Sequence, residues 1–378
     1  MVKGRSRQIL KKTGGTILSV IITLIIFSII VVIHEWGHMR VAKACGINVE
    51  EFAVGMGPKL FGFKKNGTLY SVRLLPLGGF CRMTDESDKE KGIKGFNDAN
   101  VWQRIAVCVA GPLMNFVLAL AVMTVCCMMT SVTSTTVETV SEGTPAESVG
   151  LQPGDRIVSI NGKSVHIYSD LSYYIAENGG NQMDIAVKRG KTRLAFSLTP
   201  QLKADENRYI MGITLDSKAP LLDVGLYKEI PEDMPRANFT ETLHEGFWSG
   251  IFTVKVTFEG FVKLFAGKVK TDELAGPIGV STVVGETYET TKKELGMAAV
   301  FLSMADITAL LSANLGIINL LPIPALDGGR LLIFFVEVIR RKRIPPEKEG
   351  MINLAGFAVI MLLGVFIAYN DILKIIRG

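Results

Sequence analysis

Charged residues are scarce in this sequence: Asp, Glu, Lys and Arg make up 20% of its 378 residues, whereas 48% are hydrophobic. An apolar fraction of this size excludes an intrinsically disordered chain. The net charge is only +5 and the basic residues are spread along the chain, which disfavours a nucleic-acid-binding protein. The apolar residues gather in a few long runs, which is the pattern of a membrane protein.

Cysteine and histidine are also rare. None of the five cysteines forms a Cys-x-x-Cys pair, and all lie in or beside apolar stretches. This disfavours disulfide bridges and cysteine-based metal sites, and it indicates small buried side chains. The chain has only four histidines, so a histidine-based metal site has few possible ligands.

Four apolar runs are long enough to cross a bilayer as helices. They cover residues 16–33, 105–130, about 296–321 and about 351–369. Five basic residues precede the first run, as in a signal peptide, but no small-residue cleavage site follows it. We therefore expect four transmembrane helices.

The stretch between the first two runs predicts a β-hairpin. Asn66-Gly67 stands between two apolar-rich arms, and this dipeptide favours a two-residue turn because both positions need positive φ. Residues 75–80, Leu-Pro-Leu-Gly-Gly-Phe, are apolar for a cytosolic loop. We expect them to dip into the bilayer, where protein or a wet cavity covers their backbone.

Two further segments follow the second run. Residues 136 to about 215 combine mixed charge, short Val/Ile strands and turns, and predict a soluble inserted domain. Over residues 238–270, apolar residues recur at helical spacing with charges between them, which predicts an amphipathic helix. We expect this helix to lie in the membrane surface; the alternative is a core helix of the soluble domain.

The first apolar run leads into residues 34–38, His-Glu-Trp-Gly-His, which have the spacing of a zinc site. His34 and His38 lie one helical turn apart and can bind the same divalent ion, while Glu35 can accept a proton from the water that such an ion activates. These side chains are costly at the end of a span unless they are functional. They predict a metal centre near one face of the membrane.

A catalytic zinc site usually has three protein ligands and one open position. The two remaining histidines lie outside the spans, so we predict Asp327 as the third ligand. Pro322 and Pro324 end the third run, and the turn after them presents Asp327 on the same side as His34, because one span leaves that side and the next returns to it. Asp306, inside the third run, is not assigned as a ligand, but it is the obvious substitute if Asp327 does not bind the metal.

Together these motifs resemble the site-2 proteases, and within them the bacterial RseP and RasP group. HExxH alone occurs in many metalloproteases, but its combination with Leu-Asp-Gly after a span is highly specific. The longest match is Asn-x-x-Pro-x-Pro-x-Leu-Asp-Gly at residues 319–328, with a single insert before it. The resemblance extends over nearly the whole chain, with shorter matches at residues 55–58, 76–79, 110–116 and 276–279.

The resemblance implies a mostly α polytopic membrane protein with four transmembrane helices, a membrane-associated β-hairpin and one inserted PDZ-like β-rich domain. It also implies a zinc metalloendopeptidase with one Zn²⁺ per chain. His34, His38 and Asp327 are then the metal ligands, and Glu35 is the general base.

In such a family the substrate is a single-span membrane protein, such as an anti-sigma factor or a remnant signal peptide, trimmed beforehand by a site-1-type protease. A helical substrate must unwind, and a hairpin edge can pair with its freed backbone. Asn319 matches an asparagine that helps hold the substrate, and Asn314 is a weaker match; either could instead bond between helices. The PDZ-like insert, matched at residues 150–155, 160–162 and more weakly 209–213, binds substrates or screens them by size.

The positive-inside rule orients the chain. Lys and Arg number eleven from Arg40 to Arg104 and six from Arg330 to Lys348, which places these two loops and the metal on the cytosolic face. The five basic residues before the first span oppose this, but the two loops agree with each other. We therefore expect a multi-pass protein of the bacterial cytoplasmic (inner) membrane, with the active site near the cytosolic face and the insert outside.

These expectations divide the chain into seven segments. They are a first transmembrane helix with HExxH (1–40), a cytosolic loop with the hairpin (41–104), a second transmembrane helix (105–130), the extracytoplasmic PDZ-like domain (131–220), a linker with the amphipathic helix (221–295), a third transmembrane helix with the Leu-Asp-Gly turn (296–330), and a basic loop with the fourth transmembrane helix (331–378).

Two other functions remain open. A membrane-anchored metallopeptidase that cleaves soluble chains at the cytosolic face would not require the hairpin and the Leu-Asp-Gly turn together. A non-catalytic PDZ scaffold would lack the base or a ligand, whereas Glu35 and all three predicted ligands are present.

Overall fold

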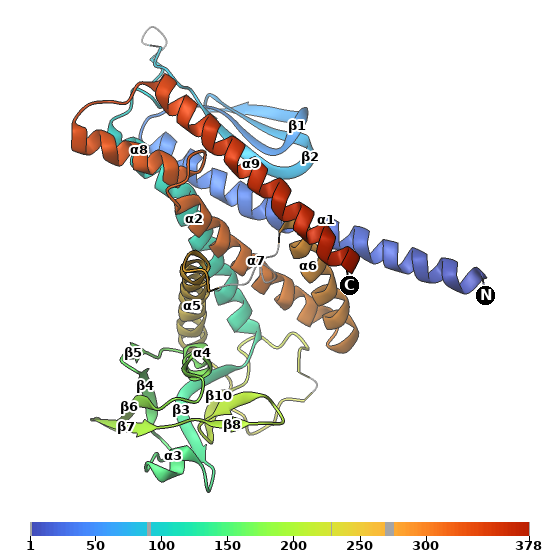
Figure 1. Ribbon diagram of the computed structural model, residues 1–378, viewed down its shortest axis with the longest axis vertical. Helices are drawn as coiled ribbons and strands as arrows, with labels where there is room; N and C mark the ends of the chain where they lie inside the picture. Colours follow the sequence, from blue (N-terminus) through green and yellow to red (C-terminus); the bar gives the residue numbers. More distant parts are fainter. Residues whose placement is uncertain (1, 89–91, 228, 269–275, 378) are drawn as a thin grey trace. The chain divides into compact units, whose positions relative to one another are not determined.

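The computed structural model in Figure 1 describes residues 2–88, 92–227, 229–268 and 276–377. The chain forms two compact units. The first joins Met1–Val122 with Thr253–Gly378 and contains the apolar helices and a small sheet. The second is Met123–Phe252 and contains the insert.

Within the described ranges, four helices are long and apolar enough to cross a membrane, which confirms the predicted number. They are α1 (Val2–Ala44), α2 (Val101–Met129), α7 (Met297–Leu320) and α9 (Pro346–Arg377). The first continues beyond its apolar run through the HExxH motif. The two histidines therefore lie on one face of this helix. Three other long helices are α5 (Phe239–Phe265), α6 (Pro277–Glu294) and α8 (Asp327–Arg340).

The predicted hairpin is present. β1 (Val49–Lys65) and β2 (Thr68–Met83) run antiparallel, and Asn66 and Gly67 both have positive φ in the turn between them. The prediction of this turn from its dipeptide is therefore confirmed.

Both hairpin strands bend, so the first part of β1 pairs with two stretches of β2. Phe52 lies opposite Tyr70 on one side and opposite Cys81 on the other. The last residues of β2 therefore form a sheet edge. This edge runs along α1, since a Cβ added at Gly78 would lie 3.3 Å from the side chain of Val31.

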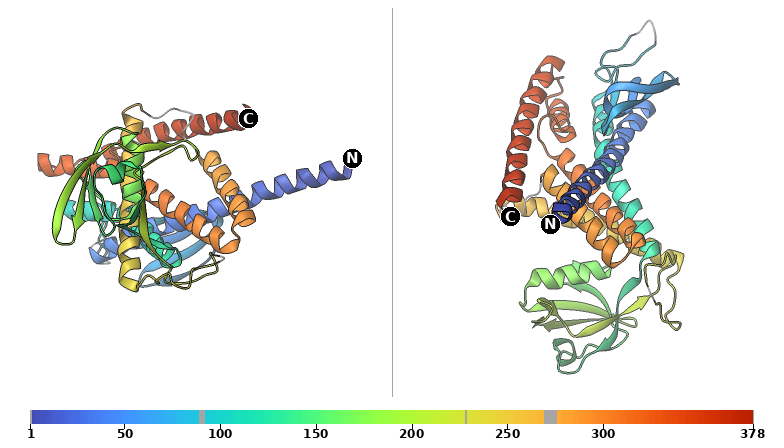
Figure 2. Two further views of the ribbon diagram at one scale, coloured as in Figure 1. Left: turned by 90° about the horizontal axis from the view of Figure 1, so that it is seen from below. Right: turned by 90° about the vertical axis from the view of Figure 1, so that its right-hand side faces the viewer.

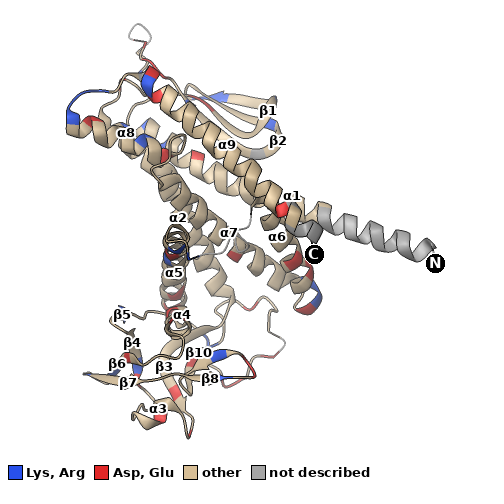
Figure 3. Ribbon diagram, in the orientation of Figure 1, with Lys and Arg blue, Asp and Glu red and all other residues tan. Residues whose placement is uncertain are grey.

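Helices α1, α2 and α8 meet in one hydrophobic core. Met39 of α1, Val107 of α2 and Phe334 of α8 are all buried in it, together with Phe96 from the loop before α2. This core fixes the end of α1, which carries the histidines, next to the start of α8, which carries Asp327. Figure 3 shows Lys and Arg gathered on the connection between α8 and α9.

The insert is built around an antiparallel sheet with strands in the order β10-β3-β4-β6-β7, and β5 pairs with β4 at its side. A second hairpin, β8-β9, and two helices complete it; Figure 2 shows α4 beside the sheet. The elements are β3 (Val132–Val140), α3 (Pro145–Ser148), β4 (Arg156–Ile160), β5 (Lys163–Ser164), α4 (Tyr168–Asn178), β6 (Met183–Arg189), β7 (Thr192–Leu198), β8 (Gln201–Lys203), β9 (Arg208–Ile210) and β10 (Ile213–Lys218).

The first half of α5 packs against this insert. The Trp248 ring stacks on His166 with 3.5 Å between ring centroids, and Phe252 meets Tyr173 edge to face. This contact is what the core-helix alternative predicted for that half of the amphipathic segment. Its position in the membrane surface stays a prediction.

Candidate metal centre

The structure brings His34, His38 and Asp327 together. Nε2 of His34 lies 3.1 Å from Nε2 of His38, and Oδ2 of Asp327 lies 3.2 Å and 3.3 Å from these two nitrogens. Both histidines are buried and the aspartate is half-buried. Within the described part of the chain, this is the one group of three such side chains that could hold a metal ion.

The donor atoms fit a zinc ion. Ligand atoms at 2.0–2.1 Å from a tetrahedral zinc lie about 3.3–3.4 Å from one another, close to the separations found here. Oδ2 of Asp327 is buried, and no hydrogen-bond partner is found for it among the described residues. A cation between the three atoms satisfies them all and leaves a fourth position open.

The third side chain reaches this point through a turn. Helix α7 ends at Leu320, and the two prolines that follow cannot continue it. The chain restarts as α8 with an extended Leu326 as N-cap and Asp327 as the first helical residue. A carboxyl must be ionised to bind a metal, and this is the ordinary form of an aspartate at neutral pH.

Helix α2 supplies partners for the other nitrogen of each imidazole. Nδ1 of His38 lies 2.8 Å from the carbonyl oxygen of Val107, so Nδ1 is the protonated nitrogen and Nε2 keeps its lone pair. Nδ1 of His34 lies 3.2 Å from the side-chain amide of Asn115. Oδ1 of the fully buried Asn115 has no partner among the described residues, and turning the amide by 180° lets it accept from His34 Nδ1–H.

Close packing of α2 on the histidines requires a glycine. A Cβ at Gly111 would lie 2.4 Å from Nε2 of His38 and 2.8 Å from Cε1 of His34. Any side chain at this position would fill the space between the imidazoles and α2. The glycine in the motif at residues 110–116 therefore leaves room for the two imidazoles beside α2.

Glu35 lies beside the histidine pair and is held by the sheet. Its Oε2 accepts a hydrogen bond from the backbone N–H of Cys81, with a length of 3.0 Å. The carboxylate of α1 is thus tied to the edge of β2.

The other predicted residues, Asn314, Asn319 and Asp306, all belong to α7. Asn314 and Asn319 are half-buried on α7, and Asp306 is exposed on the same helix. Among the described side chains, the group that could hold a metal contains Asp327 and not Asp306.

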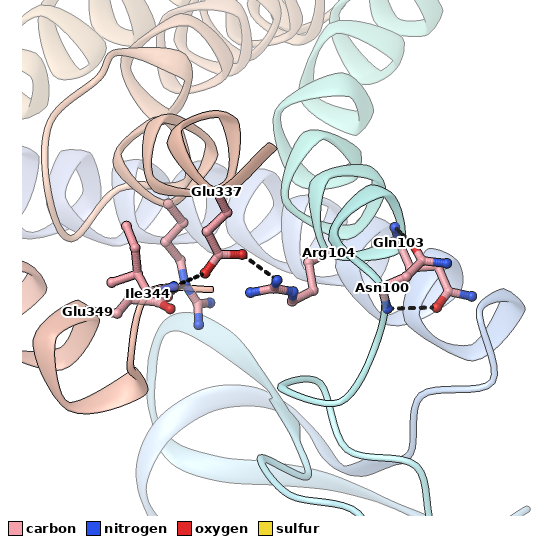
Figure 4. Close-up of polar contacts among 7 residues, drawn as sticks. Asn100, Gln103, Arg104, Glu337, Ile344 and Glu349 are labelled. Atoms are coloured by element: carbon pink, nitrogen blue, oxygen red, sulfur yellow. Dashed lines mark hydrogen bonds and ion pairs between the residues drawn. The ribbon is translucent and has the colours of Figure 1, made fainter. Parts of the chain in front are cut away.

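A buried ion pair ties α8 to α2 (Figure 4). Arg104 donates from Nη2 to Oε2 of Glu337 at 2.5 Å, and Oε1 of Glu337 accepts the backbone N–H of Ile344 at 2.8 Å. Both charged side chains are at most 5% exposed. The pair holds the helix that begins with Asp327.

Sequence reasoning did not assign roles to Val107, Cys81 or Asn115. The first two act through backbone groups, which every residue carries, so no side-chain pattern indicates them. Asn115 belongs to the segment 110–116 that matched the family, and that match was the available signal.

Comparisons with known proteins agree with these motifs. The profile of peptidase family M50 matches residues 22–363. A Bacillus subtilis protein named regulator of sigma-W protease RasP is 32% identical, and the match covers 94% of this chain and 99% of that protein. The zinc metalloprotease RasP of Bacillus licheniformis is 32% identical with the same coverage.

A solved structure matches part of the chain. The PDZ domain of an SdrC-like protein from Listeria monocytogenes is 26% identical, covers 21% of this chain and 84% of that one, and has a TM-score of 0.20.

The family profile spans the HExxH helix, the insert and the Leu-Asp-Gly turn, and the relatives extend over nearly the whole chain. With four apolar helices, the protein is an integral membrane protein. The chain belongs to peptidase family M50, the site-2 proteases, and is a zinc-dependent metalloendopeptidase.

Proposed function

We propose that His34, His38 and Asp327 are the zinc ligands of this protease and that Glu35 is its general base. The observation that supports this most strongly is the convergence of three ligand atoms, all 3.1–3.3 Å apart, from two distant parts of the chain. Val107 and Asn115 orient the two imidazoles through contacts at Nδ1, the ring nitrogen that does not face the metal position.

When bound, zinc polarises a water molecule and lowers its pKa to about 7. Glu35 is next to the first ligand in sequence and accepts the proton of the attacking water. Because Oε2 accepts the Cys81 N–H, Oε1 is the oxygen for this transfer. Glu35 then returns the proton to the amine that leaves when the peptide bond breaks.

The substrate that we propose is a single-span membrane segment, of the anti-sigma-factor or remnant-signal-peptide class. Two features support it. The edge of β2 lies at Glu35, where it can pair with an unwound substrate strand. A relative at 32% identity is named a regulator of sigma-W protease. Asn319 and Asn314, half-buried on α7, are proposed to bond to that strand.

We place the protein in the bacterial cytoplasmic membrane with the metal near the cytosolic face and the insert outside, on the basis of its basic loops. The proposed role of the PDZ-like insert is to bind or screen substrates that an upstream site-1-type protease has already shortened.

The test uses the full chain in liposomes with single-span peptides, followed by mass mapping of the products. Wild type is expected to cut within or beside the span, and a chelator should stop it. Glu35→Gln should retain one zinc per chain and lose cleavage, whereas Asp327→Ala should lose both. Cleavage of unfolded soluble chains alone, with membrane peptides left intact, would instead support the soluble-substrate alternative.

A further inference from the structure

Helix α9 contacts the turn before Asp327 through one face. Glu349, Asn353 and Gly356 are spaced four and three residues apart, so they share that face. Most of the large apolar side chains of this helix are exposed, among them Leu354, Leu362 and Val365. In Figure 2, α9 lies to one side of the first unit, beside α8.

The turn that α9 touches has a strained centre. The Leu326 N–H donates to the Ile323 carbonyl at 3.2 Å, which closes a β-turn with Pro324 and Ala325 in the middle. Ala325 has φ +77°, and a positive φ at the third residue is the mark of a type II turn, where glycine is normally found. An alanine persists there only if its surroundings hold it.

Two residues of α9 hold the peptide between Pro324 and Ala325. Oδ1 of Asn353 accepts the Ala325 N–H at 3.2 Å. A Cβ at Gly356 would lie 2.4 Å from the Pro324 carbonyl oxygen, so the absence of a side chain lets this peptide lie against the helix. Type I and type II turns differ mainly by a rotation of this central peptide of about 180°. The Asn353 bond therefore favours the type II orientation.

The orientation of this peptide determines where the next residues go. Leu326 is the N-cap of α8 and Asp327 is its first residue, so the turn leads directly into the carboxylate beside His34 and His38. We propose that Asn353 is a positioning residue for the zinc site: its bond to the Ala325 N–H selects the strained turn that places Asp327. The proposal rests on the proposed role of Asp327 as a ligand.

A second interaction joins α9 to α8, but it does not involve the backbone of the turn. Glu349 accepts a bond from Nε of Arg330 at 3.2 Å, and the Arg330 guanidinium also lies over the ring of Phe96. This tie holds α8 as a whole. Asn353 touches the backbone of the turn itself, which makes it the residue to test.

The experiment measures zinc affinity of the purified full chain by competition with a chromophoric chelator, and thermal unfolding of the zinc-free form. Asn353→Leu keeps similar volume without an acceptor, and we expect zinc to bind about 10–100-fold more weakly, the usual effect of losing an outer partner of a ligand. Asn353→Asp keeps the acceptor and should bind zinc nearly as wild type does. Leu354→Ala, at a neighbouring residue that is 70% exposed, is the control and should change nothing.

Ala325→Gly separates positioning from general stability. Glycine adopts the type II turn without strain, so Asn353→Leu combined with Ala325→Gly should recover most of the lost affinity, although no contact of Asn353 is restored. Failure of this rescue, or wild-type zinc affinity in Asn353→Leu, would overturn the proposal. Asp327→Ala is measured in parallel: if it too bound zinc normally, the ligand assignment itself would be wrong.

Discussion

The backbone N–H of Cys81 donates to Oε2 of Glu35 at 3.0 Å, which links the edge strand of the hairpin to the proposed general base. Cys81 pairs with Phe52 of β1 on one side, and its N–H points away from that partner to α1. This hydrogen bond therefore fixes the position of the proposed general base relative to the strand that is proposed to bind the substrate.

Removing this N–H should lower the catalytic efficiency of Glu35 without disrupting the β1-β2 sheet. Cys81→Pro eliminates the donor, and proline is tolerated at a strand edge whose N–H faces outward. We expect turnover to fall about 10–100-fold with zinc content unchanged, a part of the 10²–10⁴-fold that general base catalysis contributes. Cys81→Ala keeps the N–H and should retain turnover. Equal losses in both variants would mean that the thiol, not the N–H, matters.

The second prediction concerns the partner of His34. Asn115→Leu removes the amide that faces Nδ1, and we expect zinc affinity to fall about 10–100-fold. Asn115→Asp keeps an acceptor for Nδ1–H and should bind zinc at least as tightly as wild type, because a carboxylate makes the imidazole more basic. Chelator competition measures both. Weak zinc binding by Asn115→Asp would contradict an acceptor role for this residue.

Much of the site was predictable because its parts follow local rules. HExxH on a helix places His34 and His38 on one face, and prolines after a span predict a turn that presents Asp327. Asn66-Gly67 predicts its own turn for the same reason. In each case the backbone conformation is determined by residues within one or two turns.

The remaining features depend on contacts between distant segments. No pattern in the sequence indicates that the backbone carbonyl of Val107 contacts His38. An alanine at position 325 argues against the positive φ that this residue adopts. The amphipathic pattern of α5 suits a membrane surface and a domain surface equally. The contact between the rings of Trp248 and His166 shows that its first half packs on the insert, which the pattern alone does not indicate.

The third prediction tests the buried ion pair. Glu337→Ala leaves the Arg104 guanidinium buried without its carboxylate and leaves the Ile344 N–H without its acceptor. The cost of breaking such a pair is about 3–5 kcal/mol. Replacing both partners, as Arg104→Met with Glu337→Leu, should cost much less because no buried charge remains. Unfolding in detergent at a series of urea concentrations measures this, and equal destabilisation of the two variants would argue against the pair as the cause.

The last prediction is a pH dependence of the insert. Burial, and then the charge of Asp170, raise the pKa of Glu245 from 4.5 to about 7. Between these values the folded insert keeps a proton that the unfolded chain releases, so its free energy of unfolding should fall as pH rises, by at most about 1.4 kcal/mol per pH unit. Glu245→Gln should remove this slope and be the more stable protein at pH 8.

Glu241 on the same helix is the matched control, because its bond to Lys218 lowers its pKa below 4.5. Its ionised form stabilises the fold above that value, and this contribution is lost as pH falls through the lowered pKa. Glu241→Gln should therefore reduce stability at neutral pH, the opposite sign to Glu245→Gln. Urea unfolding followed by Trp248 fluorescence, with Trp36 and Trp102 replaced by Phe, reports on the insert. Identical pH profiles for the wild type and Glu245→Gln would show that Glu245 does not stay protonated in the folded insert.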